Sequence, residues 1–135
     1  MIYKLNPVDF LAALKARVEE STGLPCHDNP KDKESPFYSF ELLGIKPDNT
    51  KTMLVDVFSV RIHCIAAPSE GSEAVLDMVH GLFEAMTARL AFGCPAFRSV
   101  NQQCDGLRAV KTDESGEGHA VVDYSIGVCY RLRMK

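Results

Sequence analysis

The clearest hydrophobic pattern in the chain predicts a long strand followed by a long helix. Between residues 53 and 66, apolar residues occupy nearly every second position, interrupted by Asp56, which is the period of a half-buried strand. Between residues 72 and 90, they recur every three or four positions, as in an amphipathic helix. The predicted buried stripe of this helix is Val75, Leu76, Val79, Leu82, Phe83, Met86 and Leu90. Burial of such a stripe contributes about 10–20 kcal/mol before entropy is counted, so we expect the core to form around this strand and helix.

A second amphipathic helix is predicted over residues 6–22. Asn6 is a favourable N-cap, Pro7 suits the first helical position, and Asp9 places negative charge at the positive end of the helix dipole. Gly23 and Pro25 follow, and this pair typically ends a helix. The apolar stripe consists of Phe10, Leu11, Leu14 and Val18. This helix therefore has one face for packing and one for water.

The rest of the pattern predicts two hairpins. Residues 37–45 alternate like a strand and lead through a polar turn at 46–51 into the strand at 53–66. Residues 97–110 form a less regular strand, in which Gly106 indicates a bulge or a turn. A polar turn at 113–118 then leads to residues 120–132, which alternate without interruption.

The order helix, hairpin, helix, hairpin predicts a single α+β domain over residues 1–135. Because each helix carries one apolar stripe, we expect both to pack on one face of a sheet of four to five strands. The order of elements is α-β-β-α-β-β, and the sheet is expected to be antiparallel, with a mixed sheet as the alternative.

One face of the strand at 53–66 is a candidate contact surface. It is apolar over its first half and polar over its second half, where Arg61 and His63 lie, so we expect another subunit to cover part of it. Arg131 and Arg133 would complete a basic patch there if the last strand is a neighbour. The alternative interpretation is a solvated sheet surface.

Residues 26–36 are a second candidate. The segment is polar and contains two prolines, which predicts an exposed loop. Asp28, Lys31 and Lys33 are its candidate docking residues. The alternative interpretation is a solvated connector.

Composition narrows the classes of partner. A net charge of -3 without a basic stripe argues against direct nucleic-acid binding. The opening residues lack the apolar core of a signal peptide, and no apolar run reaches the ~18 residues of a membrane span, so we expect a cytosolic protein. The five cysteines are scattered without a C-x-x-C pair, which favours free thiols over disulfides or a zinc site.

The sequence predicts no catalytic residues, no cofactor and no metal site. The four histidines lack metal-binding spacing, and the glycines form no phosphate-binding loop. One alternative is a small-ligand-binding α+β domain or enzyme, with a pocket between helices and sheet that uses His63, Tyr124 or Tyr130. Another is a dimeric interaction module.

The chain resembles the small phage tail-terminator and tail-completion proteins of the lambda U type and related prophage proteins of unknown function. The resemblance rests on the helix at 6–22 with its Gly23-Leu24-Pro25 sequel, the strand at 55–65, the joint and helix at 69–82, and the last strand at 121–128. It implies a structural protein without catalytic residues that forms a ring, commonly a hexamer, at the end of the tail tube. The implied partners are tail-tube and head-connector proteins, met in the bacterial host cytoplasm during assembly and retained in the virion tail.

Overall fold

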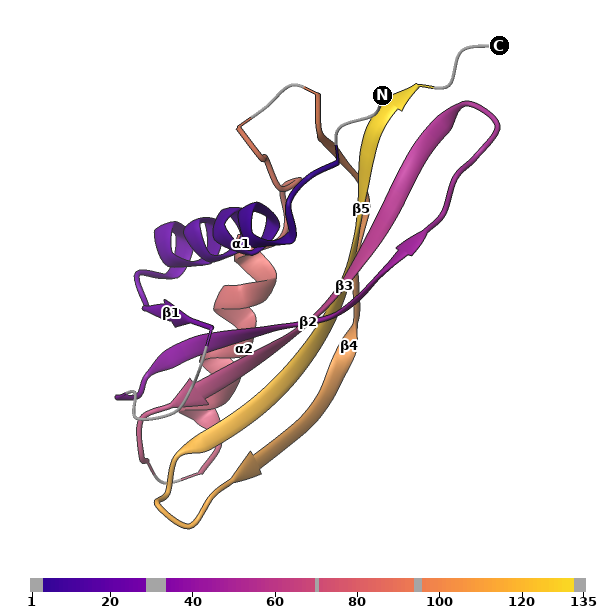
Figure 1. The fold of residues 1–135 in the computed structure, drawn as a ribbon. Coiled ribbons are helices and arrows are strands. Elements are labelled where there is room, and N and C mark those ends of the chain that lie inside the picture. Colours follow the sequence, from indigo (N-terminus) through magenta and orange to yellow (C-terminus); the bar gives the residue numbers. More distant parts are fainter. Residues whose placement is uncertain (1–3, 29–33, 70, 94–95, 133–135) are drawn as a thin grey trace.

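The structure, a computed structural model, describes residues 4–28, 34–69, 71–93 and 96–132, and for residues 131 and 132 it describes the backbone alone. The elements are α1 (Pro7–Thr22), β1 (Cys26–His27), β2 (Phe37–Pro47), β3 (Met53–Ala66), α2 (Glu73–Ala85), β4 (Arg98–Thr112) and β5 (Gly118–Leu132). The strands form a sheet in the order β1-β2-β3-β5-β4. Both helices lie on one side of this long, twisted sheet (Figure 1). The predicted α+β fold, with two helices on one face, is confirmed.

The sheet joins two antiparallel hairpins through their long strands. β2 pairs with β3, β4 pairs with β5, and β3 pairs antiparallel with β5 along most of its length. β1 adds a short parallel pair to the edge, where Cys26 lies opposite Tyr38. The expectation that residues 26–36 form an exposed loop is therefore wrong at its start. Cys26 is buried, and its backbone N–H donates to Oε1 of Glu19 at 3.0 Å, which holds this segment beside α1.

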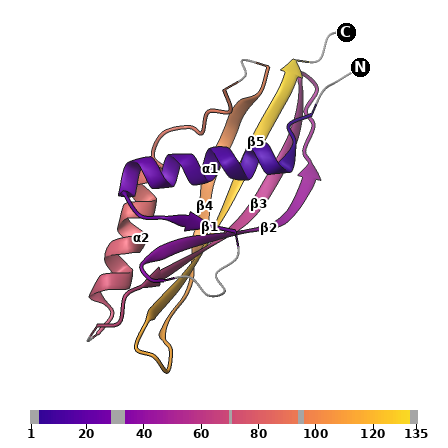
Figure 2. The same ribbon diagram turned by 60° about the vertical axis from the view of Figure 1, so that its left-hand side comes forward.

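Helix α1 begins and ends as predicted. The side chain of Asn6 accepts a hydrogen bond from the backbone N–H of Val8 at 2.9 Å, and Gly23 adopts a left-handed conformation with φ of 75°. The Asn6 side chain is a partner for a free N–H of the first turn, and the left-handed Gly23 turns the chain out of the helix. Its stripe of Phe10, Leu14 and Val18 is fully buried. In Figure 2, α1 lies across the strands.

Helix α2 buries a slightly different face from the predicted one. Val75, Val79 and Leu82 are buried as expected, but Leu76 is 43% exposed and Phe83 is 38% exposed. Met78 and Ala85 are buried in their place, because the helix is rotated so that these residues meet the sheet. The hydroxyl of Tyr38 donates to the carbonyl of Met78 at 2.7 Å and ties β2 to this helix.

Helix α2 also ends earlier than the predicted residue 90, at Ala85. The reason is a set of partners from distant parts of the chain. The guanidinium of Arg17 donates to the carbonyls of Ala88 and Arg89, at 2.8 Å each, and to that of Ala85 at 3.3 Å. The side chain of Gln102 donates to the carbonyls of Met86 and Ala88 and accepts from the N–H of Leu90. These side chains are hydrogen-bond partners for backbone groups that a longer helix would have paired internally. The helix can therefore end at Ala85.

Candidate interaction surface

The sheet face opposite the helices, here called the helix-free face, carries a buried carboxylate between two guanidinium groups. Asp123 on β5 is 7% exposed. Arg61, its register partner on β3, donates to it twice, from Nε at 2.9 Å and from Nη2 at 3.1 Å. Arg108 on β4 donates from Nε at 3.1 Å. Hydrogen bonds from Arg61 and then Arg108 hold the pKa of Asp123 below its usual range, against the opposing effect of burial. Asp123 therefore crosslinks three strands.

At three irregularities in β4, an inserted residue places its side chain against a partner outside this strand. The register against β5 shifts between Val100 and Gln103, between Cys104 and Gly106, and between Leu107 and Ala109. The residues inserted there include Gln102, which caps α2, Asp105, which accepts from the hydroxyl of Ser125, and Arg108, which binds Asp123. Bulges commonly aim a side chain in this way. The predicted irregularity at Gly106 is therefore one of three in this strand.

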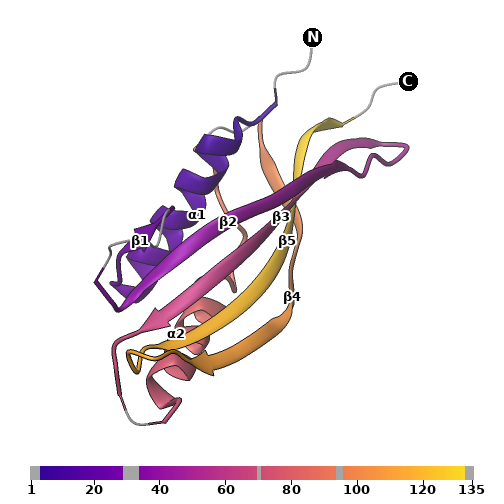
Figure 3. The same cartoon turned by 60° about the horizontal axis from the view of Figure 1, so that its bottom comes forward.

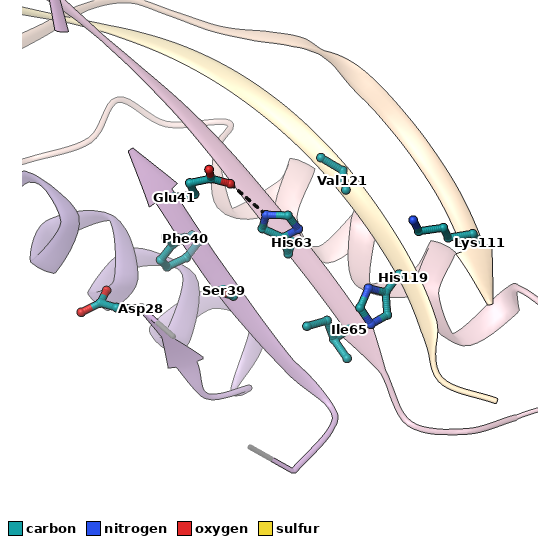
Figure 4. Close-up of a pocket in the computed structure, with 9 residues that line it drawn as sticks. All are labelled: Asp28, Ser39, Phe40, Glu41, His63, Ile65, Lys111, His119 and Val121. Carbon is teal, nitrogen blue, oxygen red and sulfur yellow. Dashed lines mark hydrogen bonds and ion pairs between the residues drawn. The ribbon is translucent and has the colours of Figure 1, made fainter. Parts of the chain in front are cut away.

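A groove of about 490 Å³ lies on the same face, nearer the turn between β4 and β5. Figure 4 shows residues from β2, β3, β4 and β5 around it, with His63 directed toward Glu41. Nε2 of His63 lies 3.3 Å from Oε1 of Glu41. His119 and Lys111, which pair in register, line the opposite part of the groove.

This arrangement differs from the pocket expected for a ligand-binding domain between helices and sheet. His63 lies on the helix-free face, whereas Tyr124 and Tyr130 belong to the core cluster on the helix side. Burial raises the pKa of both tyrosines, so their hydroxyls stay protonated. Burial also raises the pKa of Cys26 and Cys64 to about 12, which disfavours a thiolate nucleophile at either position.

The residues predicted for an interface are only partly brought together. Arg61 and His63 share the helix-free face, but the backbone of Arg131 pairs with Leu54 near the other end of β3. The register places Asp123, and not an arginine, opposite Arg61. The side chain of Arg131 lies outside the description, so the patch of Arg61 with Arg131 stays a prediction. Arg133, Lys31 and Lys33 lie outside the described residues. Asp28 is exposed, contacts Nζ of Lys15 at 3.3 Å and lines the groove.

The sequence pattern did not identify Asp123 or Arg108 as a candidate site residue. Asp123 lies in the polar set of the last strand, and a register that places it opposite Arg61 would have identified the pair. Arg108 gave no comparable signal, because it reaches Asp123 through a bulge.

Asp123→Asn is expected to lower the free energy of unfolding at neutral pH. Because the pKa of Asp123 is lower in the folded chain than the ~3.9 of an unfolded chain, the ionised carboxylate stabilises the fold above that value. This contribution is lost as the pH falls through the lower, folded pKa. Urea titrations of parent and variant should therefore show a difference at neutral pH that shrinks at about pH 3. If parent and variant differed in free energy of unfolding by the same amount at both pH values, the ionised carboxylate of Asp123 would not be the source of the stabilisation.

Comparisons with known proteins agree with this architecture. No curated protein sequence matches the chain. A solved structure of the virion of a native gene transfer agent particle contains a chain with the same fold, with a TM-score of 0.68 and 15% identity, covering 87% of this chain and 92% of the other. No helix in the described ranges is long and apolar enough to cross a membrane.

The sequence as a whole fits one family. A family model described as "Putative tail termination protein" matches residues 1–135. This match agrees with the resemblance found in the helices and strands of the sequence. The chain therefore belongs to the family of phage tail terminators.

Proposed function

We propose that copies of this structural tail protein assemble into a ring, a hexamer by the resemblance, that ends the growth of the phage tail tube and joins it to the head connector. Assembly would take place in the bacterial host cytoplasm, and the ring would remain in the virion tail. The proposal assigns the chain no catalytic role. Its support is the family membership together with one structural feature, an apolar arm.

The arm is the end of the β2–β3 hairpin, residues 43–57. Figure 3 shows this hairpin extending beyond both helices. Leu43 and Ile45 on the arm are 45% and 41% exposed. Both lie on β2 past its short pairing with β1, where β2 is an edge of the sheet. Exposed apolar side chains on such an edge are typical of protein contacts. This is the observation that carries the proposal.

The arm is held in one conformation by its turn. The N–H of Asp48 donates to the carbonyl of Val55 at 2.8 Å, and the N–H of Val55 donates to the side chain of Asn49 at 2.9 Å. The N–H of Met53 donates to the hydroxyl of Thr50 at 2.9 Å. A preformed projection loses little conformational entropy when it binds.

A projecting arm suits a ring because it differs from the surface that receives it. When one patch binds a different patch on the next copy, the contact repeats around a rotation axis and can close. The arm supplies the first patch. The helix-free face with Arg61 and His63, and the segment that includes Asp28, are the proposed surfaces for the next copy, the tail tube or the head connector.

Replacing both Leu43 and Ile45 with aspartate is expected to weaken self-association about tenfold or more, which corresponds to ~1.4 kcal/mol. Both side chains are substantially exposed, so the monomer should keep its thermal unfolding midpoint within a few degrees. Light scattering over a concentration series, with and without purified tail-tube protein, measures the native mass.

The matched control replaces Leu107 and Val110 with aspartate. These β4 residues are 42% and 39% exposed and lie outside the arm. The control should assemble like the parent. A parent that stays monomeric even with tail-tube protein would overturn the ring, and an arm variant that assembles as well as the control would overturn the role of the arm.

A further inference from the structure

The turn between β4 and β5 gathers three side chains with metal-binding atoms. Asp113, Glu117 and His119 place a carboxylate oxygen, a second carboxylate oxygen and an imidazole nitrogen within 4.8 Å of one another. Nε2 of His119 lies 3.7 Å from Oδ2 of Asp113. Within the described residues, no other group of three or more such side chains comes this close together.

The turn itself fixes the first of these carboxylates. Oδ1 of Asp113 accepts from the N–H of Ser115 at 2.9 Å, from its hydroxyl at 2.6 Å and from the N–H of Glu117 at 3.1 Å. Oδ1 is thus committed to the turn. The other oxygen, Oδ2, is the one nearest His119.

The second and third groups are also placed by the hairpin. His119 lies two residues beyond Glu117, and its backbone pairs with Lys111 on β4 and with Ile65 on β3. His119 is half-buried at the rim of the groove, so its position is set by two neighbouring strands rather than by the turn alone.

The distance between Asp113 and His119 is close to the one that two ligands of a single ion require. Zinc lies about 2.0–2.2 Å from nitrogen and oxygen ligands, so two ligands of a tetrahedral site are roughly 3.3–3.6 Å apart. The separation of 3.7 Å between Asp113 and His119 nearly meets this value. The side chain of Asp113 is 39% exposed and that of His119 is 31% exposed, so small rotations can close the remaining gaps.

The donor set selects a class of metal. Imidazole nitrogen binds zinc and related first-row metals, whereas magnesium and calcium prefer oxygen ligands alone. The turn also carries net negative charge, since Asp113, Glu114 and Glu117 outnumber the neighbouring Lys111. Three protein ligands leave a position for water.

We propose that Asp113, Glu117 and His119 bind one divalent first-row metal ion of the zinc class at the tip of the β4–β5 hairpin. The ion would join the turn to the first residues of β5, close to the groove. The site is independent of ring assembly and can be tested on the monomer.

The test is calorimetric titration of the protein with zinc chloride at neutral pH. Thiols compete for zinc, so Cys104, which is exposed, and Cys94, which lies outside the described residues, are first replaced with serine. This parent is expected to bind one zinc ion per chain and to show a higher thermal midpoint with zinc than without it. Magnesium chloride should produce neither effect.

His119→Gln and Glu117→Gln should each raise the dissociation constant for zinc at least tenfold, because loss of a residue that only supports a metal ligand already costs roughly 10–100-fold. His80→Gln is the matched control, because His80 and Glu84 form an exposed pair on α2 at 2.6 Å, outside the hairpin. The control should bind zinc like the parent. Absence of zinc binding in the parent, unchanged binding in both hairpin variants, or loss of binding in the control would overturn the proposal.

Discussion

Phe10→Ala is expected to lower the free energy of unfolding by about 3–5 kcal/mol, the range for removing a large buried aromatic side chain. Phe10 is fully buried, and its ring stacks on that of Phe58 with centroids 4.3 Å apart. Its ring also stacks on that of Phe92, with centroids 5.9 Å apart. One ring thus joins α1 to β3 and to the segment after α2, and its loss leaves a cavity that these three parts cannot easily fill. Urea denaturation at neutral pH measures the change.

Val8→Ala is the control for this prediction. Val8 belongs to the same helix but is 70% exposed, so the substitution should change the free energy of unfolding by no more than about 0.5 kcal/mol. A cost below about 1 kcal/mol for Phe10→Ala would mean that the aromatic stack is not part of the cooperative core.

The fold could be predicted from sequence where short-range patterns determine structure. The cap at Asn6 and the stop at Gly23 set the bounds of α1, and the alternation from residue 120 onward set the last strand. The end of α2 could not be predicted in this way. It depends on Arg17, about seventy residues earlier in the chain, and on Gln102, whose side chain extends back from β4 to the end of the helix. No local signal connects either residue with that helix.

The candidate surface was less predictable than the fold because it depends on register. Arg61 and His63 were correctly placed on one face of their strand, but their partners follow from which residue lies opposite. The last strand is a neighbour of this strand, as the expected patch required, but its register places Asp123 opposite Arg61 and the backbone of Arg131 opposite Leu54. The cluster proposed to bind a metal gave no signal in the sequence for a similar reason. Asp113, Glu117 and His119 do not have the H-x-x-x-H or H-E-x-x-H spacing of helical metal sites. Their side chains come together only in the folded turn.

Gly127→Ala is the second substitution with a large expected effect. A Cβ at this position of β5 would lie 2.7 Å from the carbonyl oxygen of Val100 and 3.0 Å from its Cγ2. The first of these atoms belongs to the backbone, so a side-chain rotation cannot relieve the contact. β4 approaches so closely here because its register shifts just after Val100, where Asn101 has a positive φ of 52°. The sheet must therefore separate locally to admit a methyl group.

We expect Gly127→Ala to lower the free energy of unfolding by about 1–3 kcal/mol, as overpacking of a close contact usually does. Gly44→Ala is its control, since a Cβ at position 44 on β2 meets no atom within 4 Å and the backbone there does not have a positive φ. Urea denaturation compares the two, and amide hydrogen exchange should show faster exchange along β4 in Gly127→Ala alone. Because β4 carries Arg108 and Asp105 to the helix-free face, loosening this strand should also weaken the ion pairs of Asp123. Equal stability of the two variants would show that the sheet accommodates the methyl group and that the close approach of β4 does not constrain this face.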